Sequence, residues 1–353
     1  MMLLKPYLKF MLEHWAADLF ITGDSVPQVR INGSLKAVGK EPLAPDVVSR
    51  AAGEIMGERE QALFERDWNV DFGLHVDGLG RFRVNVFRQR QQVAIVFRSL
   101  QPEVPRIEQL RLPSVLYDLA MARQGLVLIT GPTGSGKSTT LAAMIGHRNE
   151  KASGHILTIE DPIEFAQSSK RSIVNQREVG IDARSYSSAL RSALRESPDV
   201  VMIGEARDSE TLESVIELAG TGQLSLTTLH ANSAAQTLDR ITNMFPADRR
   251  PGLLMDLSLY LRAIISQRLV ISKKGERVPA VEVMLNTPHI AEQIRQGQFD
   301  RIQPALEEAR SVGLRDMDTA LLQLYRHGVI EKDEALANAH SRNNLESRIN
   351  FAG

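Results

Sequence analysis

The stretch LVLITGPTGSGKSTTL, residues 126–141, is the most informative part of this sequence about its fold. Its first five residues predict a short buried strand, and the residues after Ser138 predict the start of a helix. Between them, 131–138 match the pattern G-x-x-x-x-G-K-[ST]. Glycines in such a loop let backbone N–H groups turn inward around phosphates, and the helix N-terminus adds its positive dipole end. The stretch therefore predicts a strand, loop and helix unit that binds a nucleoside triphosphate.

Individual positions of this loop have predicted roles. Lys137 is expected to reach the β and γ phosphates, and the Ser138 hydroxyl to ligate Mg²⁺. The alternative is a glycine-rich turn without a ligand, which the full match between a strand and a helix disfavours. The expected nucleotide-binding residues are Gly131, Pro132, Thr133, Gly134, Ser135, Gly136, Lys137, Ser138 and Thr139.

The composition limits the classes of protein that this sequence can encode. Its 353 residues suffice for two or three domains, and it has no cysteine for a disulfide or a thiolate metal site, which suits a reducing cytoplasm. Because 42 Lys and Arg residues balance 43 Asp and Glu residues, no net charge favours nucleic acid or an anionic membrane. The apolar window 252–271 contains Asp256, Arg262 and Arg268, which predicts a soluble packed helix instead of a membrane span.

Changes in sequence pattern divide the chain into four regions. Residues 1–98 combine an amphipathic helix, a helical stretch at 46–67 and several alternating strands, which predicts a small α+β domain. Residues 99–113 contain three prolines among polar residues and are expected to form a linker. A nucleotide-binding core is expected at 114–271, and a mainly helical region with one strand-like piece at 272–353.

The core region alternates short apolar runs with helical stretches. The runs lie at 126–130, 155–159, 200–203 and 224–229. Continuous apolar runs separated by helices are typical of strands that are buried on both faces of a parallel sheet. The sequence therefore predicts an α/β fold with a largely parallel sheet.

Three further motifs close or leave these predicted strands. They are HILTIEDPIEF at 155–165, DVVMIGEARD at 199–208 and LTTLHAN at 226–232. Because ligands gather at the carboxyl ends of strands in such sheets, their acids and histidine are expected to face the phosphates. With the phosphate loop, they resemble the Walker A, Asp box, Walker B and His box of the hexameric secretion ATPases of type II secretion, type IV secretion and type IV pili. The resemblance extends to ADLFIT and GRFRVNVF near the N-terminus, and is strongest to the pilus retraction ATPases PilT and PilU.

The strand end at 200–205 departs from the common P-loop pattern, because Gly204 stands where a magnesium-binding acid is expected and Glu205 follows it. The resemblance implies that a glycine and a glutamate are the normal Walker B ending of this family. Mg²⁺ keeps several waters in its shell, so an acid one residue later can act through a water. Glu205 is therefore expected to hold the metal through a water. The alternative is that Glu205 only pairs with Arg207 or Arg195.

The other two motifs carry one candidate catalytic residue each. By resemblance, Glu164 polarises the attacking water, since phosphoryl transfer mostly requires positioning and charge neutralisation. By the same resemblance, His230 senses the γ phosphate, and a purely structural, hydrogen-bonded histidine is the alternative. Glu160 and Asp161 have an alternative role in capping local N–H groups.

Arginines of the N-terminal region are candidates for a role in trans. The charge that develops during phosphoryl transfer is often met by an arginine from another subunit. The resemblance places the N-terminal domain against a nucleotide bound in a ring, which makes Arg83 and Arg98 candidates. The alternative is that Arg81 and Arg83 face solvent from alternating strand positions.

One segment differs from the family pattern. Many members have Glu-Thr-Gly-His before the strand of the His box, whereas this chain has Gly-Thr-Gly-Gln at 220–223. The acid and the first histidine are both missing. We expect this departure to affect the coupling between subunits or the rate of catalysis.

The resemblance also implies an architecture and a function. It implies a RecA-like core, a PAS-like N-terminal domain, ATP and Mg²⁺ as cofactors, and a homohexamer at the cytoplasmic face of the inner membrane. The expected function is pilus retraction and twitching motility, as a PilU-like accessory to a PilT-like paralogue, acting on a PilC-like platform protein. No nucleic-acid partner is expected.

Three alternatives to this function remain open. A pilus-extension or type II secretion ATPase of the PilB or GspE kind usually has extra N-terminal domains and a four-cysteine zinc element. A RecA-like nucleic-acid motor would use a basic track and aromatic stacking, which a neutral chain with 5% aromatic residues does not favour. A non-hydrolysing, nucleotide-bound partner of a paralogue fits the departure at 220–223.

Overall fold

The computed structural model describes residues 3–31, 34–99, 104–308 and 313–351. The chain divides into two compact units, one of 1–103 with 164–166 and the other of 104–163 with 167–353. Residues 100–103 of the predicted linker lie outside the described residues. In the described part of the chain, no helix has the length and apolar content needed to cross a bilayer.

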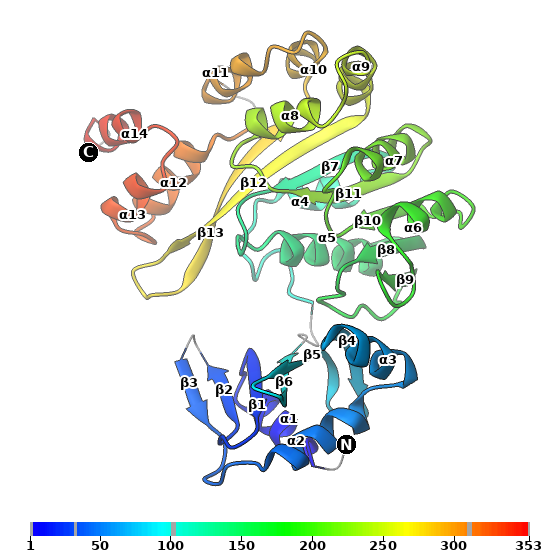
Figure 1. The fold of residues 1–353 in the computed structure, drawn as a ribbon. Coiled ribbons are helices and arrows are strands. Elements are labelled where there is room, and N and C mark those ends of the chain that lie inside the picture. Colours follow the sequence, from blue (N-terminus) through cyan, green and yellow to red (C-terminus); the bar gives the residue numbers. More distant parts are fainter. Residues whose placement is uncertain (1–2, 32–33, 100–103, 309–312, 352–353) are drawn as a thin grey trace. The chain divides into compact units, whose positions relative to one another are not determined.

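The first unit is built on a six-stranded antiparallel sheet with the order β3-β2-β1-β6-β5-β4 (Figure 1). Alternation is clearest in β5, where Phe82, Val84 and Val86 are buried and pack in the core of this unit. The α+β pattern predicted for this region is thus observed. Its elements are α1 (Lys5–Glu13), β1 (Asp18–Thr22), β2 (Gln28–Ile31), β3 (Ser34–Ala37), α2 (Pro45–Ile55), α3 (Glu58–Asp67), β4 (Asn69–Val76), β5 (Gly80–Gln89) and β6 (Gln92–Ser99).

The helical stretch predicted at 46–67 is two helices. Met56 has extended backbone angles (φ −89°, ψ 129°), and so does Gly57 (φ −73°, ψ 176°). Two consecutive extended residues end the i to i−4 ladder of α2, and α3 starts again after them. The apolar periodicity alone could not show this break.

The second unit contains a seven-stranded sheet with the order β13-β12-β7-β11-β10-β8-β9. All neighbouring strands are parallel except β12 and β13, which form an antiparallel hairpin. The prediction of a largely parallel sheet is confirmed, and β9 is a strand that the sequence analysis did not identify. The strands are β7 (Gly125–Thr130), β8 (Gly154–Glu160), β9 (Ser172–Glu178), β10 (Val200–Ile203), β11 (Leu224–Leu229), β12 (Leu261–Ile271) and β13 (Arg277–Leu285).

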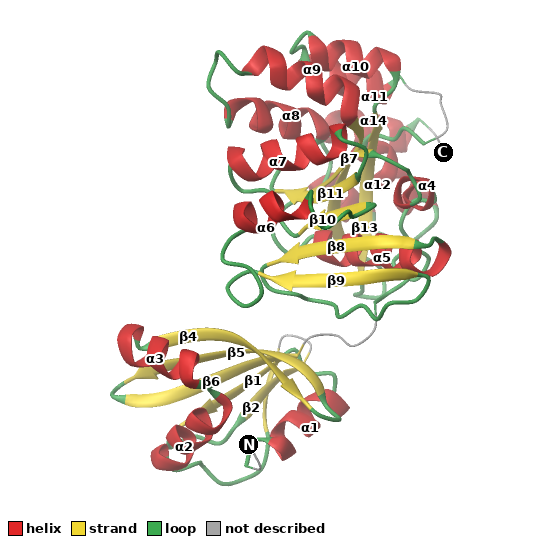
Figure 2. Ribbon diagram, turned by 90° about the vertical axis from the view of Figure 1, so that its right-hand side faces the viewer, coloured by secondary structure: helices red, strands yellow, loops and turns green. Residues whose placement is uncertain are grey.

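Helices cover both faces of this sheet (Figure 2). Leu126 and Leu128 of β7 pack with α6 (Tyr186–Ala193), α7 (Ser209–Gly220), α8 (Ala234–Asn243) and α9 (Arg250–Tyr260). Val127 and Ile129 point to the opposite face and pack with α4 (Val115–Ala120) and α5 (Lys137–Lys151). A strand with apolar residues on both sides has no polar alternation, which explains why these strands are continuous apolar runs.

The window 252–271 was predicted to be one packed helix, and this prediction is wrong. Helix α9 ends at Tyr260, and β12 continues from Leu261 to Ile271. The strand lies beside the P-loop strand, with Ile264 opposite Leu128 and Ile265 opposite Ile129. Both faces of β12 are buried, so its apolar run resembles that of a buried helix segment.

The sheet continues past residue 271, because β13 pairs with β12 along nine residue pairs. After β13 the chain is helical among the described residues, as predicted. The end of the hairpin packs against the last three helices through a small core that includes Val270, Val278 and Leu321. These C-terminal elements are α10 (Pro288–Arg295), the 3-10 turn η1 (Phe299–Arg301), α11 (Ile302–Glu307), α12 (Met317–Arg326), α13 (Lys332–Ala337) and α14 (Arg342–Asn350).

Candidate nucleotide-binding site

The loop between β7 and α5 has the backbone that its glycines permit. Gly131, Gly134 and Gly136 have φ values of 151°, 77° and 85°, which side chains rarely tolerate. A Cβ atom on Gly131 would lie 2.3 Å from the carbonyl oxygen of Gln267 and 2.5 Å from the Ser135 hydroxyl. The loop therefore lies so close to β12 that no other residue fits at position 131.

Lys137 begins α5 and lies over this loop. Its Nζ atom donates hydrogen bonds of 3.0 Å to the carbonyl oxygens of Gly131 and Pro132. Ser138 is exposed in the first turn of α5, and Thr139 is half-buried. The structure thus brings an ammonium group and a hydroxyl group together at a helix N-terminus, which is a favourable arrangement for phosphate.

Gln267 of β12 supports the loop, and the sequence analysis did not identify it. The Thr140 hydroxyl donates a 2.8 Å hydrogen bond to Gln267 Oε1, and Gln267 Nε2 donates a 2.7 Å bond to the Ser135 carbonyl oxygen. The residue is only 3% exposed. One side chain therefore holds both the loop and the first turn of α5. The available signal was the polar pair Ser266–Gln267 inside an apolar strand.

Glu205 and His230 meet at the ends of neighbouring strands. Strands β10 and β11 pair in parallel, with Ile203 opposite Thr227, so the residues that follow them lie close together. His230 Nε2 is 2.8 Å from Glu205 Oε1, and Arg207 Nε donates a 2.9 Å hydrogen bond to Glu205 Oε2. The pairing with Arg207 that was considered as an alternative is present, and it coexists with the His230 contact. The Glu205 carboxylate raises the pKa of Arg207 through this hydrogen bond.

The backbone around Gly204 explains why the acid follows it. A Cβ atom on Gly204 would lie 3.2 Å from the Tyr186 hydroxyl and 3.5 Å from the Cα atom of Glu160. The Gly204 carbonyl oxygen accepts a 2.7 Å hydrogen bond from the Thr228 hydroxyl. A larger acidic side chain at position 204 would displace Tyr186, whereas Glu205 is accommodated beside His230.

The residues of the Asp box are distributed over two environments. Glu160 is buried at the end of β8, where its Oε1 accepts hydrogen bonds from Thr158 Oγ1 (2.6 Å) and Gln176 Nε2 (3.0 Å). Asp161 is exposed. Glu164 belongs to the segment 164–166, which groups with the first unit. The role of Glu164 in polarising water stays a prediction.

The two candidate arginines lie on β5 and β6 of the first unit. Arg98 Nε donates a 2.9 Å hydrogen bond to Asp18 Oδ1, and Asp18 also lies 3.3 Å from Arg30 Nε. Arg83 is held more loosely, with its Nε 3.7 Å from Asp71 Oδ1. Arg98 therefore has a structural partner within its own unit, and the role of both arginines in trans stays a prediction.

A pocket of about 360 Å³ adjoins the loop. Its size is suited to a small organic ligand. One wall comes from the loop, α5 and β12, and the other walls come from the segment before α4 and from the hairpin of β12 and β13. The lining residues are Gln109, Leu110, Arg111, Leu112, Gly136, Thr139, Thr140, Gln267, Leu269, Glu276, Arg277, Val278 and Pro279.

The atypical segment 220–223 lies far from the loop within this chain. Leu224 pairs with Gly125 at the start of β7, whereas the loop follows the last residue of that strand. Because a strand rises about 3.3 Å per residue, roughly 17 Å separates the two end residues of β7. The segment therefore lies at the amino ends of the strands, whereas the phosphate loop lies at their carboxyl ends. Any effect of the segment on catalysis would act over that distance or on another subunit.

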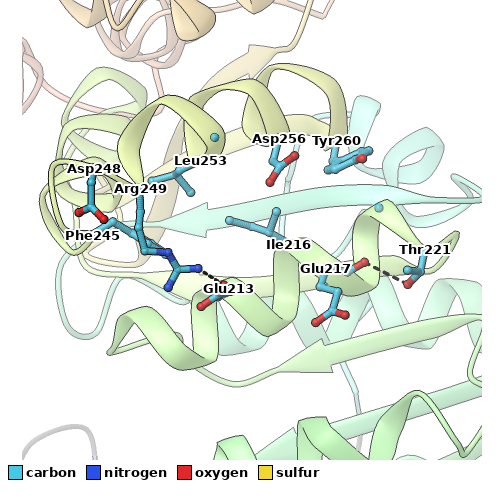
Figure 3. Close-up of a pocket in the computed structure, with 12 residues that line it drawn as sticks. Glu213, Ile216, Glu217, Thr221, Phe245, Asp248, Arg249, Leu253, Asp256 and Tyr260 are labelled. Carbon is cyan, nitrogen blue, oxygen red and sulfur yellow. Dashed lines mark hydrogen bonds and ion pairs between the residues drawn. The ribbon is translucent and has the colours of Figure 1, made fainter.

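This segment adjoins a second pocket, of about 680 Å³, between α7 and α9 (Figure 3). A Cβ atom on Gly220 would lie 2.9 Å from the Tyr260 ring. The Thr221 hydroxyl donates to Gln223 Oε1 at 2.8 Å. The small residue at position 220 thus leaves space for Tyr260, and the family's usual glutamate would require this ring to move.

Comparison with known proteins places the chain in a family. A family model described as "Type II/IV secretion system protein" matches residues 4–314. The type IV pilus ATPase PilU of Pseudomonas aeruginosa is 44% identical over 97% of this chain and 90% of the relative. PilT of the same organism, described as a type IV pilus retraction ATPase, is 40% identical over 94% of this chain and 96% of the relative. A crystal structure of the pilus retraction motor PilT with bound ADP has a TM-score of 0.91 and 40% identity, and the match covers 97% of this chain and 98% of the other. The chain therefore belongs to the family of type II/IV secretion system ATPases.

Proposed function

We propose that this protein is a motor ATPase that powers type IV pilus retraction, in a PilU-like role beside a PilT-like paralogue. The observation that carries the proposal is the glycine loop braced by Gln267, with Lys137 over the loop and the Glu205–His230 pair at the ends of two neighbouring strands. The relatives named PilU and PilT match nearly the whole chain. The site supports hydrolysis, and the relatives support its use in retraction.

The residues of the site fit ATP and Mg²⁺. Backbone N–H groups of the loop and the ammonium of Lys137 would neutralise the β and γ phosphates. The exposed hydroxyl of Ser138 and the carboxylate of Glu205, the latter through a water, would supply the oxygen ligands that Mg²⁺ prefers. Bound Mg²⁺ would offset the negative charge that develops on the phosphate oxygens. The residues 131–139 as a whole form the proposed nucleotide site.

His230 and Glu164 would act on the γ phosphate and the attacking water. The Glu205 contact at 2.8 Å orients the His230 ring, so His230 can report whether a γ phosphate is bound. Glu164 would orient the water, and Arg83 or Arg98 of a neighbouring subunit would stabilise the transition state. The pocket of about 360 Å³ beside Thr139 would take the base and ribose. The proposed catalytic residues are thus Glu164, Glu205, His230, Arg83 and Arg98.

The architecture proposed for the working enzyme is a homohexamer. Its domains would be a PAS-like domain at 1–98, a linker at 99–113, a RecA-like core at 114–271 and a mainly helical region at 272–353, whose strand β13 joins the sheet of the core. Nucleotide binding and hydrolysis would change the angle between the N-terminal domain and the RecA-like core by bending at the linker. The ring would act on a PilC-like platform protein at the cytoplasmic face of the inner membrane.

Phosphate release by the purified protein tests the enzymatic part. We expect Mg²⁺-dependent hydrolysis of ATP that Glu164→Ala abolishes while the protein still binds nucleotide. An absence of turnover at every oligomeric concentration would support the non-hydrolysing partner instead. Hydrolysis stimulated by single-stranded DNA, with binding that weakens steeply as salt increases, would support the nucleic-acid motor.

A deletion strain tests the direction of force. If the protein drives retraction, cells without it will carry many surface pili and will lose twitching motility. Cells without any surface pili would support the extension ATPase and overturn the proposal. Complementation with Lys137→Ala separates the need for nucleotide from the need for the protein itself.

A further inference from the structure

A chain of buried hydrogen bonds crosses three strands of the second unit. The Thr130 hydroxyl donates to Ser266 Oγ at 3.2 Å, and the Ser266 hydroxyl donates to Glu282 Oε1 at 3.0 Å. The backbone N–H of Ala234 donates to the same Oε1 atom at 2.8 Å. Thr130, Ser266 and Glu282 are each at most 1% exposed. Glu282 thus accepts hydrogen bonds from both Ser266 and Ala234.

The sheet register places these side chains in one row. Thr130 of β7 pairs with Ser266 of β12, and Ser266 pairs with Glu282 of β13. Directly paired residues of neighbouring strands point to the same face, so the three polar groups are in contact. The register of the sheet therefore makes these three side chains neighbours.

The two ends of this row lie next to the phosphate loop and next to the segment that contains His230. Thr130 directly precedes Gly131, the first residue of the loop. Ala234 is the first residue of α8, whose N-cap residue Ser233 follows three positions after His230. The row therefore connects the strand that carries the phosphate loop to the segment that carries the γ-phosphate sensor.

Burying the Glu282 carboxyl group costs free energy, which only its hydrogen bonds can offset. Burial raises the pKa of Glu282, and the groups that act on it electrostatically from the C-terminal part are His340 and Asp316. An apolar residue would avoid this desolvation, but it would leave the Ser266 hydroxyl and the Ala234 N–H without their acceptor. Packing alone therefore does not explain Glu282.

We propose that Glu282 is a positioning residue that fixes the phosphate loop and the His230 segment relative to one another. Nucleotide binding at the loop is thereby transmitted to α8, and the His230 ring is held where a γ phosphate arrives. This inference rests on the proposed ATPase function but assigns a role to a residue that touches no substrate.

Hydrogen exchange on the full-length protein tests the connection without requiring turnover. We expect Mg²⁺ with the non-hydrolysable analogue AMPPNP to slow exchange at the loop and also at the first turn of α8, residues 233–238. In Glu282→Leu, protection of the loop remains and protection of α8 is lost. In Glu282→Gln, both remain, because the amide oxygen can still accept from Ser266 and Ala234.

The control is Asp318→Leu, which removes another buried carboxylate of the same unit. Asp318 is 3% exposed and accepts from the backbone N–H groups of His340 (2.6 Å) and Ser341 (3.0 Å), away from the loop. It should keep the protection of α8 even if it lowers the melting temperature. Protection of α8 that persists in Glu282→Leu, or that is lost equally in Asp318→Leu, would overturn the proposal.

Steady-state kinetics provide the second readout. We expect Glu282→Leu to lower kcat about tenfold or more while KM for MgATP changes less than threefold, since the loop itself still binds. Glu282→Gln should keep kcat within about threefold of the parent. A parent protein without hydrolysis would refute the proposed function, but the exchange experiment would still decide the role of Glu282.

Discussion

The replacement Gln267→Leu removes the hydrogen bonds that support the phosphate loop and leaves the glycines of the loop unchanged. Leucine has nearly the volume of glutamine, so it fills the same space without forming either hydrogen bond. The Thr140 hydroxyl would lose its acceptor at 2.8 Å, and the Ser135 carbonyl would lose its donor at 2.7 Å. Thr140 is 1% exposed and Ser135 is 3% exposed, so water cannot readily replace these bonds.

The expected loss of stability follows from these two groups. A buried polar group without a partner costs about 1–3 kcal/mol, so two of them cost about 2–6 kcal/mol. The added apolar surface of leucine returns about 1 kcal/mol. For a folded unit of about 150–250 residues, each kcal/mol shifts Tm by about 2–4 °C, so a net loss of about 1–5 kcal/mol should lower Tm by roughly 2–20 °C. If about 1.4 kcal/mol of this loss falls on the loop, nucleotide binds about tenfold more weakly.

Thermal unfolding and nucleotide titration measure both effects, with Gln293→Leu as the matched control. Gln293 is also buried, at 6% exposure, but its Oε1 has no hydrogen-bond partner among the described residues. The same chemical change there should alter stability by less than about 1 kcal/mol. Thr140→Val in the Gln267→Leu background should restore part of the stability, because it removes one of the two orphaned groups. Equal effects of Gln267→Leu and Gln293→Leu would show that the two hydrogen bonds of Gln267 do not support the loop.

Three further predictions concern the chemistry of the site. His230→Gln removes the ring that contacts Glu205 at 2.8 Å, so phosphate release should fall about 10² fold with little change in nucleotide affinity; an unchanged rate would make His230 structural. Because burial raises the pKa of Glu282, its contribution to stability is fully present below the ordinary glutamate pKa and is lost as pH rises through the raised value. The denaturant midpoint of Glu282→Gln relative to the parent should therefore increase with pH, and a pH-independent difference would contradict this. Arg83→Ala should lower hydrolysis, and mixing it with Lys137→Ala subunits should restore part of the rate, because the arginine then comes from a neighbour; mixtures without any recovery would exclude a role in trans.

The sequence was informative where a local rule applies. The phosphate loop was predicted because each of its glycines satisfies a backbone requirement within nine residues. The four apolar runs became strands β7, β8, β10 and β11, because strands buried on both faces need apolar residues throughout. Glu205 and His230 were expected to lie at the carboxyl ends of parallel strands, and the structure places them there, with a contact of 2.8 Å between them that was not predicted.

The supports of the site were not predictable by the same reasoning. Gln267 bonds to the Ser135 carbonyl across 132 sequence positions, and Ser266 bonds to Thr130 across 136. No local pattern shows which distant residue Ser266 or Gln267 contacts. The apolar run that contains Ser266 and Gln267 was assigned to a helix instead of β12. The order of strands in the sheet, which places β12 next to β7, had to be known first.

The structure of β12 shows why two adjacent polar residues have different tasks. Successive side chains of a strand point to opposite faces, and Ile264 and Ile265 of β12 pack in the cores on either side of the sheet. Ser266 therefore shares the face of α8 and joins Glu282, whereas Gln267 shares the face of α5 and holds the loop. A strand displaced by one residue would exchange these faces and break both connections at once. The register of β12 against β7 thus sets the geometry of the loop and of the His230 segment together, and the adjacent residues Ser266 and Gln267 link the two.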